Sequence, residues 1–297
     1  MEVIIEFGTP EIEEIIKQEL VIFLNSLGNF NPPLKLDRII ISPEIEKKVN
    51  EFYGNDTFKS VRNHGDNSIN VAAKYCTNEK EGILFLSSIL YLDNQDSVTR
   101  YFVFFHELFH ANNKQKLQLP SQQNFSIDNS FFTLYWIYDE YVADRNAYKI
   151  VDVIFPKKTE LWDAYLISDL NGFSSMLVDE KNYQFIKNEI SKFRNHQLTV
   201  NEYCENIRQL ASDLSVAIVH AYSLIHHYPN QFSPTEFSKS KYVNVKTLNL
   251  IEYISKKYKD AVFDLSDGLD LINQYLTNFG VLFEERDTGP YCHILDI

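Results

Sequence analysis

The sequence predicts an α+β fold, in which a small sheet near the N-terminus is accompanied and followed by helices. Short apolar or alternating runs are concentrated in the first ninety residues, and longer stretches with helical periodicity follow them. The chain has 297 residues, 44% of them hydrophobic, with only 9 Gly and 9 Pro. It is therefore long enough to bury a proper core, and its composition is that of neither a disordered nor a fibrous protein.

The first elements are expected to alternate between strand and helix. Residues 2–6 predict a short strand. Thr9 and Pro10 predict the start of a helix, because Thr is a common cap and Pro is favoured at the first helical position. The next two elements expected are a strand over residues 36–42 and a helix over residues 43–53.

A β-hairpin is expected next. Residues 67–76 place Ile69, Val71, Ala73 and Tyr75 on alternate positions, the pattern of a half-buried strand. A polar turn follows, and residues 83–86 continue as a mostly buried strand, so the two strands should pair.

Two helices come after the hairpin. Asp96 or Ser97 can cap the first helix, which should continue to about Asn113. The second is expected over residues 130–153, because Pro156 then acts as a stop signal. These two helices carry the residues on which the functional interpretation depends.

The remainder of the chain is expected to be mainly helical. Thr199 and Glu202 fit a capping box that opens a helix reaching about His227. The later elements expected are helices over residues 245–258 and 265–279, then strands over residues 281–285 and 291–295 that form a hairpin. We therefore divide the chain into a core over residues 1–156 and a mainly helical region over residues 157–297.

Composition excludes several classes of protein. Lys and Arg total 28 against 41 Asp and Glu, a net charge of −13, which argues against a nucleic-acid or anionic-membrane partner. The longest apolar stretches are too short to span a bilayer, and the acidic N-terminus does not resemble a signal peptide. Three cysteines without C-x-x-C spacing indicate no disulfide framework. We expect a soluble, cytoplasmic protein of undetermined oligomeric state.

The segment Tyr101–Ala111 carries the strongest chemical signal, the pattern H-E-x-x-H. His106 and His110 lie four residues apart, so on a helix they share one face and can approach one tetrahedral ion. Glu107 projects about 100° away, where it can reach a metal-bound water. Zinc lowers the pKa of such a water towards ~7, so Glu107 can take its proton. The apolar flanks predict burial, which is costly for charges unless they are paired or metal-bound.

A catalytic zinc site usually has a third protein ligand and an open fourth position. The predicted helix over residues 130–153 supplies Glu140 and Asp144, which share a face four residues apart. Small residues at Ala143 and Ala147 allow this helix to pack closely against another. Glu140 would complete a His-His-Glu site, and Asp144 would accept a hydrogen bond from a ligating histidine and fix its tautomer. The alternative is that these acids form a solvated helix face.

Together, H-E-x-x-H at 106–110 and E-x-x-A-D at 140–144 resemble the gluzincin metallopeptidases. The resemblance covers residues 67–153 and implies a zincin-like core within residues 1–156, with bound Zn²⁺ and a protein or peptide substrate. It also implies that an edge strand, matched here by residues 82–86, pairs with extended substrate.

A looser likeness is to the intracellular zincins of the ImmA/IrrE type, which usually carry Gly at the position of Phe109. The metzincin variant is excluded, because Asn113 and Lys116 occupy the places of its Gly and third His. Peptide hydrolysis also needs a donor for the developing oxyanion, and His220 and Tyr222 are candidates on one helical stretch.

Three hypotheses follow. The first is a zinc metallopeptidase in which His106, His110 and Glu140 bind Zn²⁺ and Glu107 is the general base. The second is a zincin-like regulatory or partner-binding protein with a structural metal and no peptidase activity. The third is a metal-free core helix whose two histidines and glutamate hydrogen-bond to one another.

Overall fold

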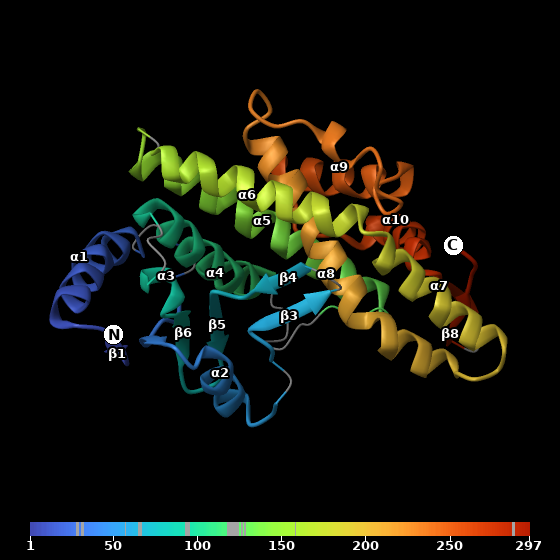
Figure 1. The fold of residues 1–297 in the computed structure, drawn as a ribbon, viewed down its shortest axis with the longest axis horizontal. Coiled ribbons are helices and arrows are strands. Elements are labelled where there is room, and N and C mark those ends of the chain that lie inside the picture. The colour runs from blue at the N-terminus through green and yellow to red at the C-terminus, as the bar shows by residue number, and fades with distance from the viewer. Residues whose placement is uncertain are drawn as a thin grey trace. The chain divides into compact units, whose positions relative to one another are not determined.

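The computed structural model of the chain is α+β, as the sequence predicts (Figure 1). It describes residues 1–27, 30, 33–56, 58–64, 67–92, 96–117, 125, 127, 129–157, 159–286 and 289–297. Two compact units are present. The first comprises residues 1–63, 68–122 and 143–167, and the second comprises residues 64–67, 123–142 and 168–297.

The first unit contains a four-stranded mixed sheet in the order β1-β2-β6-β5. Its strands are β1 (Glu2–Ile5), β2 (Arg38–Ser42), β5 (Ala73–Thr77) and β6 (Gly82–Ser87). The pairs β1–β2 and β2–β6 are parallel, whereas β5 and β6 form the antiparallel hairpin that the sequence predicts, with Tyr75 opposite Leu84.

Two expectations about this sheet are wrong. The predicted strand over residues 67–76 is divided into β4 (Asn67–Asn70) and β5, because β4 pairs instead with β3 (Val61–His64) in a separate two-stranded sheet. Residues 82–86 do not form the edge of the main sheet. They lie in β6, which is enclosed by β2 on one side and β5 on the other. Among the described strands, β5 is the one at the edge of the sheet on the side of this hairpin.

Helices cover both faces of this sheet. The helices that belong entirely to the first unit are α1 (Pro10–Ser26), α2 (Ile45–Tyr53), α3 (Ile89–Leu92) and α4 (Ser97–Leu117). On one face, Ile45 and Val49 of α2 pack against Ile40, Cys76 and Phe85. Because side chains alternate along a strand, Ile39, Ile41, Leu84 and Leu86 point to the other face, and they are also buried.

Helix α4 is held in the first unit by aromatic packing and by contact with the sheet edge. Phe23 of α1 meets Phe104 with ring centroids 5.1 Å apart, and α4 contacts β5. The helix continues four residues beyond the predicted end at Asn113, to Leu117.

The second unit is mainly helical. Its further elements are α7 (Glu180–Arg194), α8 (Val200–His227), η2 (Pro234–Phe237), α9 (Val245–Lys259), η3 (Ser266–Gly268), α10 (Leu269–Leu276), η4 (Thr277–Phe279), β7 (Val281–Arg286) and β8 (Gly289–Ile294). The capping box at Thr199 and the C-terminal hairpin are confirmed. The helix predicted over residues 265–279 is instead a short α-helix between two 3₁₀ turns. At its start, a Cβ on Gly268 would lie 2.6 Å from the ring of Tyr253, so the backbone approaches that ring closely.

Two helices contain the boundary between the units. In α5 (Ser130–Ile154) it falls after Val142, and in α6 (Glu160–Val178) it falls after Ile167. The division at residue 156 therefore stays a prediction. The three cysteines are free thiols. Among the described residues, no helix combines the length and the apolar character needed to cross a lipid bilayer.

Candidate metal centre

The two histidines of H-E-x-x-H face one another across one turn of α4. Their Nε2 atoms lie 2.9 Å apart, and the ring planes are nearly perpendicular. The helix is well placed to hold them, because neighbouring residues Phe104, Phe105 and Leu108 are fully buried. The imidazoles are themselves mostly enclosed, with a side-chain exposure of 13% for His106 and a residue exposure of 7% for His110.

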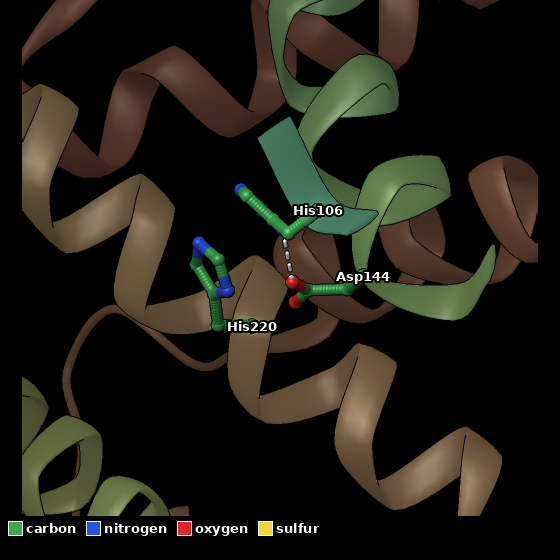
Figure 2. A group of neighbouring side chains, drawn as sticks. All are labelled: His106, Asp144 and His220. Atoms are coloured by element: carbon green, nitrogen blue, oxygen red, sulfur yellow. Dashed lines mark hydrogen bonds and ion pairs between the residues drawn. The ribbon is translucent and has the colours of Figure 1, made fainter. Parts of the chain in front are cut away.

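Asp144 of α5 fixes the orientation of His106. Its Oδ1 lies 2.8 Å from Nδ1 of His106, and its side chain is fully buried (Figure 2). When the carboxylate is ionised, Nδ1 of His106 carries a hydrogen and donates a hydrogen bond to it. Nε2 of a neutral His106 then carries no hydrogen and can only accept. This is the relation in which a carboxylate holds a metal-ligating histidine. The sequence predicts this role for Asp144.

The same tautomer is compatible with the short distance between the two Nε2 atoms. If Nε2 of His106 is bare, His110 supplies the hydrogen between the two nitrogens. Two imidazole nitrogens bound to one tetrahedral zinc at ~2.0–2.1 Å lie roughly 3.3 Å apart. Replacing this hydrogen by a cation would therefore require the rings to separate by only about 0.4 Å from the observed 2.9 Å.

A second contact establishes the direction of α5 beside α4. One turn before His106, the ring of Phe102 stacks on Tyr148, with centroids 4.5 Å apart and planes inclined by 22°. One turn before Tyr148 is Asp144, the partner of His106. The two helices therefore run antiparallel, and each step of four residues forward on α4 corresponds to four residues back on α5.

Glu140 is the other acid of α5 that the sequence predicts to take part in the site. Helix α5 is unbroken from Ser130 to Ile154, so Glu140 lies one turn from Asp144 on the same face. Side chains at this spacing have Cβ atoms ~5–6 Å apart. Within the second unit, Oε2 of Glu140 lies 3.6 Å from Nε2 of His220, and the Glu140 side chain is 15% exposed.

The hydrogen-bond partner of Glu107 is a backbone group of the sheet. It is 8% exposed, and its Oε2 accepts a 2.7 Å hydrogen bond from the backbone N–H of Tyr75 in β5. Sequence reasoning missed this partner, because a backbone amide has no signature in the sequence. The sequence indicates this amide only through the alternation of residues 67–76. That pattern predicts a strand but not which side chain bonds to its edge.

The two candidate oxyanion donors point in different directions. His220 and Tyr222 are two residues apart on α8 and so project about 200° from each other. His220 contacts Glu140 and stacks on Phe173, with ring centroids 5.6 Å apart. Tyr222 instead lies beside His226, in a buried position that raises the pKa of its hydroxyl. Only His220 is near a predicted metal ligand within this unit.

Two sets of described residues have the donor atoms that a metal ion needs. They are His106 with His110 and Glu140, and His106 with Asp144 and His220, which Figure 2 draws. In the first set, the hydrogen bond between His106 and Asp144 can stay in place, because it uses Nδ1 of His106 and leaves Nε2 for a metal. Two imidazoles and one carboxylate are a typical donor set for zinc.

No family model, curated protein or solved structure matches this chain. Its function must therefore be argued from the chemistry of these residues.

Proposed function

We propose that the chain is a zinc-dependent metallopeptidase with a zincin-like core, in which His106, His110 and Glu140 bind the metal. One observation carries the proposal, the antiparallel register of α4 and α5 given by the Phe102–Tyr148 and His106–Asp144 contacts. This register supports the proposal, because it turns the H-E-x-x-H face of α4 towards the face of α5 that carries Asp144. The buried carboxylate on Nδ1 of His106 further supports it, because it leaves Nε2 bare for a metal.

The donor set also fits a catalytic site. Three protein ligands leave a fourth position for water, and a bound zinc ion would acidify that water and polarise a scissile carbonyl. Glu107, one residue from His106 but offset from the ligand face, would take a proton from the attacking water and deliver it to the leaving amine. His220 would donate a hydrogen bond to the developing oxyanion.

The substrate is proposed to be an extended segment of a protein or peptide. Since β6 is enclosed, the edge that an extended segment could join is that of β5, which lies beside α4. Strand addition at such an edge supplies main-chain hydrogen bonds that do not depend on sequence.

The deciding experiment compares wild type with Glu107→Gln. Gln has nearly the same shape but cannot take a proton, so we expect about one zinc per chain in both proteins. Hydrolysis of a randomised fluorescence-quenched peptide library should be abolished in the variant. His106→Ala should lose both the hydrolysis and the zinc. A Gln variant that cleaves as fast as wild type, or a wild-type protein purified without a tag that binds no zinc, would refute the proposal.

The contact between His220 and Glu140 favours one alternative, a structural metal site in a regulatory or partner-binding protein. With His220 as a fourth protein ligand, the site would be closed to water. His220→Ala separates the two functions. In a peptidase it should lower kcat while zinc affinity stays within a few-fold of wild type. In a structural site it should weaken zinc binding, and wild type should show no hydrolysis.

A further inference from the structure

The outer edge of β5 is the feature from which we draw a further inference. In an antiparallel pair, the backbone groups of alternate residues face towards and away from the partner strand. The N–H of Ser87 donates to the carbonyl of Ala72, so Lys74 and Cys76 face β6. The N–H of Tyr75 therefore faces away from β6, towards the free edge.

An outward N–H of an edge strand normally bonds to water or to another chain. That of Tyr75 does neither, because the residue is only 4% exposed and its N–H reaches Oε2 of Glu107 at 2.7 Å. A bond from an amide to a carboxylate is charge-assisted and stronger than one between neutral groups. Among the described residues, Glu107 makes no other hydrogen bond, so its Oε1 is left unengaged by the protein.

We propose that the backbone N–H of Tyr75 is a positioning group for Glu107. By holding Oε2, it fixes the carboxylate plane, directs Oε1 to the proton that must be moved, and makes the sheet edge part of the catalytic apparatus. This role rests on the proposed peptidase function, although the contact itself does not. An extended substrate at β5 would consequently have to use other outward groups of the edge, such as the carbonyl of Tyr75.

Amide hydrogen exchange tests the contact without any substrate or metal. In wild type, the Tyr75 amide should exchange slowly although no strand covers it. Glu107→Ala should accelerate its exchange about tenfold or more, since a bond to a charged group is lost. The Cys76 amide, which faces β6, should keep its rate. Fast exchange of Tyr75 in wild type, or equal acceleration of Cys76, would overturn the proposal.

A pair of substitutions tests the catalytic consequence. Tyr75→Pro removes the N–H at an outward-facing edge position, where proline breaks no ladder bond. Tyr75→Ala is the matched control, because both variants lose the ring and its hydroxyl bond to the Lys35 carbonyl. We expect the Pro variant to have a kcat about tenfold or more below that of the Ala variant on the peptide library, with KM and zinc content unchanged. Equal kcat values would overturn the positioning role.

The two proposals fail in distinguishable ways. If wild type binds no zinc and cleaves nothing while the Tyr75 amide is protected through Glu107, the peptidase function is wrong and the contact is structural. If hydrolysis depends on Glu107 but the exchange of Tyr75 does not, only the positioning role is wrong.

Discussion

Removing the carboxylate of Asp144 tests the candidate metal centre while leaving every proposed ligand in place. The side chain is fully buried and lies 2.8 Å from Nδ1 of His106. Asp144→Asn keeps an oxygen that can accept from Nδ1 but loses the charge. Asp144→Ala removes the acceptor, and Nδ1–H of His106 is then buried without its partner.

The expected loss can be estimated in two ways. Partners that hold a metal-ligating histidine usually contribute 10–100-fold to metal affinity, which corresponds to about 1.4–2.7 kcal/mol. A buried donor left without an acceptor costs about 1–3 kcal/mol, which is a similar range. We therefore expect Asp144→Asn to bind zinc about tenfold more weakly than wild type, and Asp144→Ala up to about a hundredfold more weakly.

Competition with a chromophoric zinc chelator at pH 7 measures these affinities, and circular dichroism checks that each variant is folded. Asp152→Asn, on the same helix two turns further along, is the matched control and should bind zinc like wild type. A folded Asp144→Ala variant with unchanged zinc affinity would refute the assignment of Asp144. An equal loss in Asp152→Asn would show that the effect belongs to the helix as a whole.

Other outcomes concern the fold and are measured by urea unfolding. Gly82→Ala should lower the free energy of unfolding by about 1–3 kcal/mol, because its Cβ would lie 1.9 Å from the Lys35 carbonyl oxygen. Gly172 lies in a helix with open space around it, so Gly172→Ala should raise the free energy of unfolding by about 0.5–1 kcal/mol. Equal changes in the Gly82 and Gly172 variants would contradict the steric argument. Thr199→Ala should lose about 1 kcal/mol with the cap, and no loss would contradict the capping box. Hydrogen bonds from the backbone and hydroxyl of Thr199 lower the pKa of Glu202 below its ordinary value of 4.5. The ionised Glu202 therefore stabilises the folded protein fully above pH 4.5. This stabilisation is lost as the pH falls through the lower pKa of the folded state. Wild type should therefore lose stability relative to Glu202→Gln as the pH falls below 4.5, and parallel pH profiles would contradict this.

The features that the sequence predicts correctly are formed by residues that lie close together in the chain. The β5–β6 hairpin has its turn and both strands within fifteen residues, and the Thr199 cap is defined by four. The H-E-x-x-H spacing likewise needs only one helical turn to bring two imidazoles together.

The parts that failed depend on contacts between distant segments. β6 becomes an inner strand because β2, more than forty residues earlier, pairs along its other side, and nothing in residues 82–86 encodes that partner. The strand predicted over residues 67–76 is divided because its first half pairs with β3. The amide that holds Glu107 belongs to the backbone of Tyr75, so no choice of side chain announces it.

The two acids of α5 that belong to the proposed site have different surroundings. Asp144 is fully buried, and its Oδ1 lies 2.8 Å from Nδ1 of His106. Glu140, one turn away, is longer and 15% exposed. In the proposed site, the longer side chain of Glu140 would serve as the third ligand. A shift of one residue in either helix would turn the side chains by about 100° and separate Asp144 from His106. The proposal therefore depends on the i, i+4 spacing of both helices, since the spacing on α4 brings the imidazoles together and the spacing on α5 puts both acids on one face.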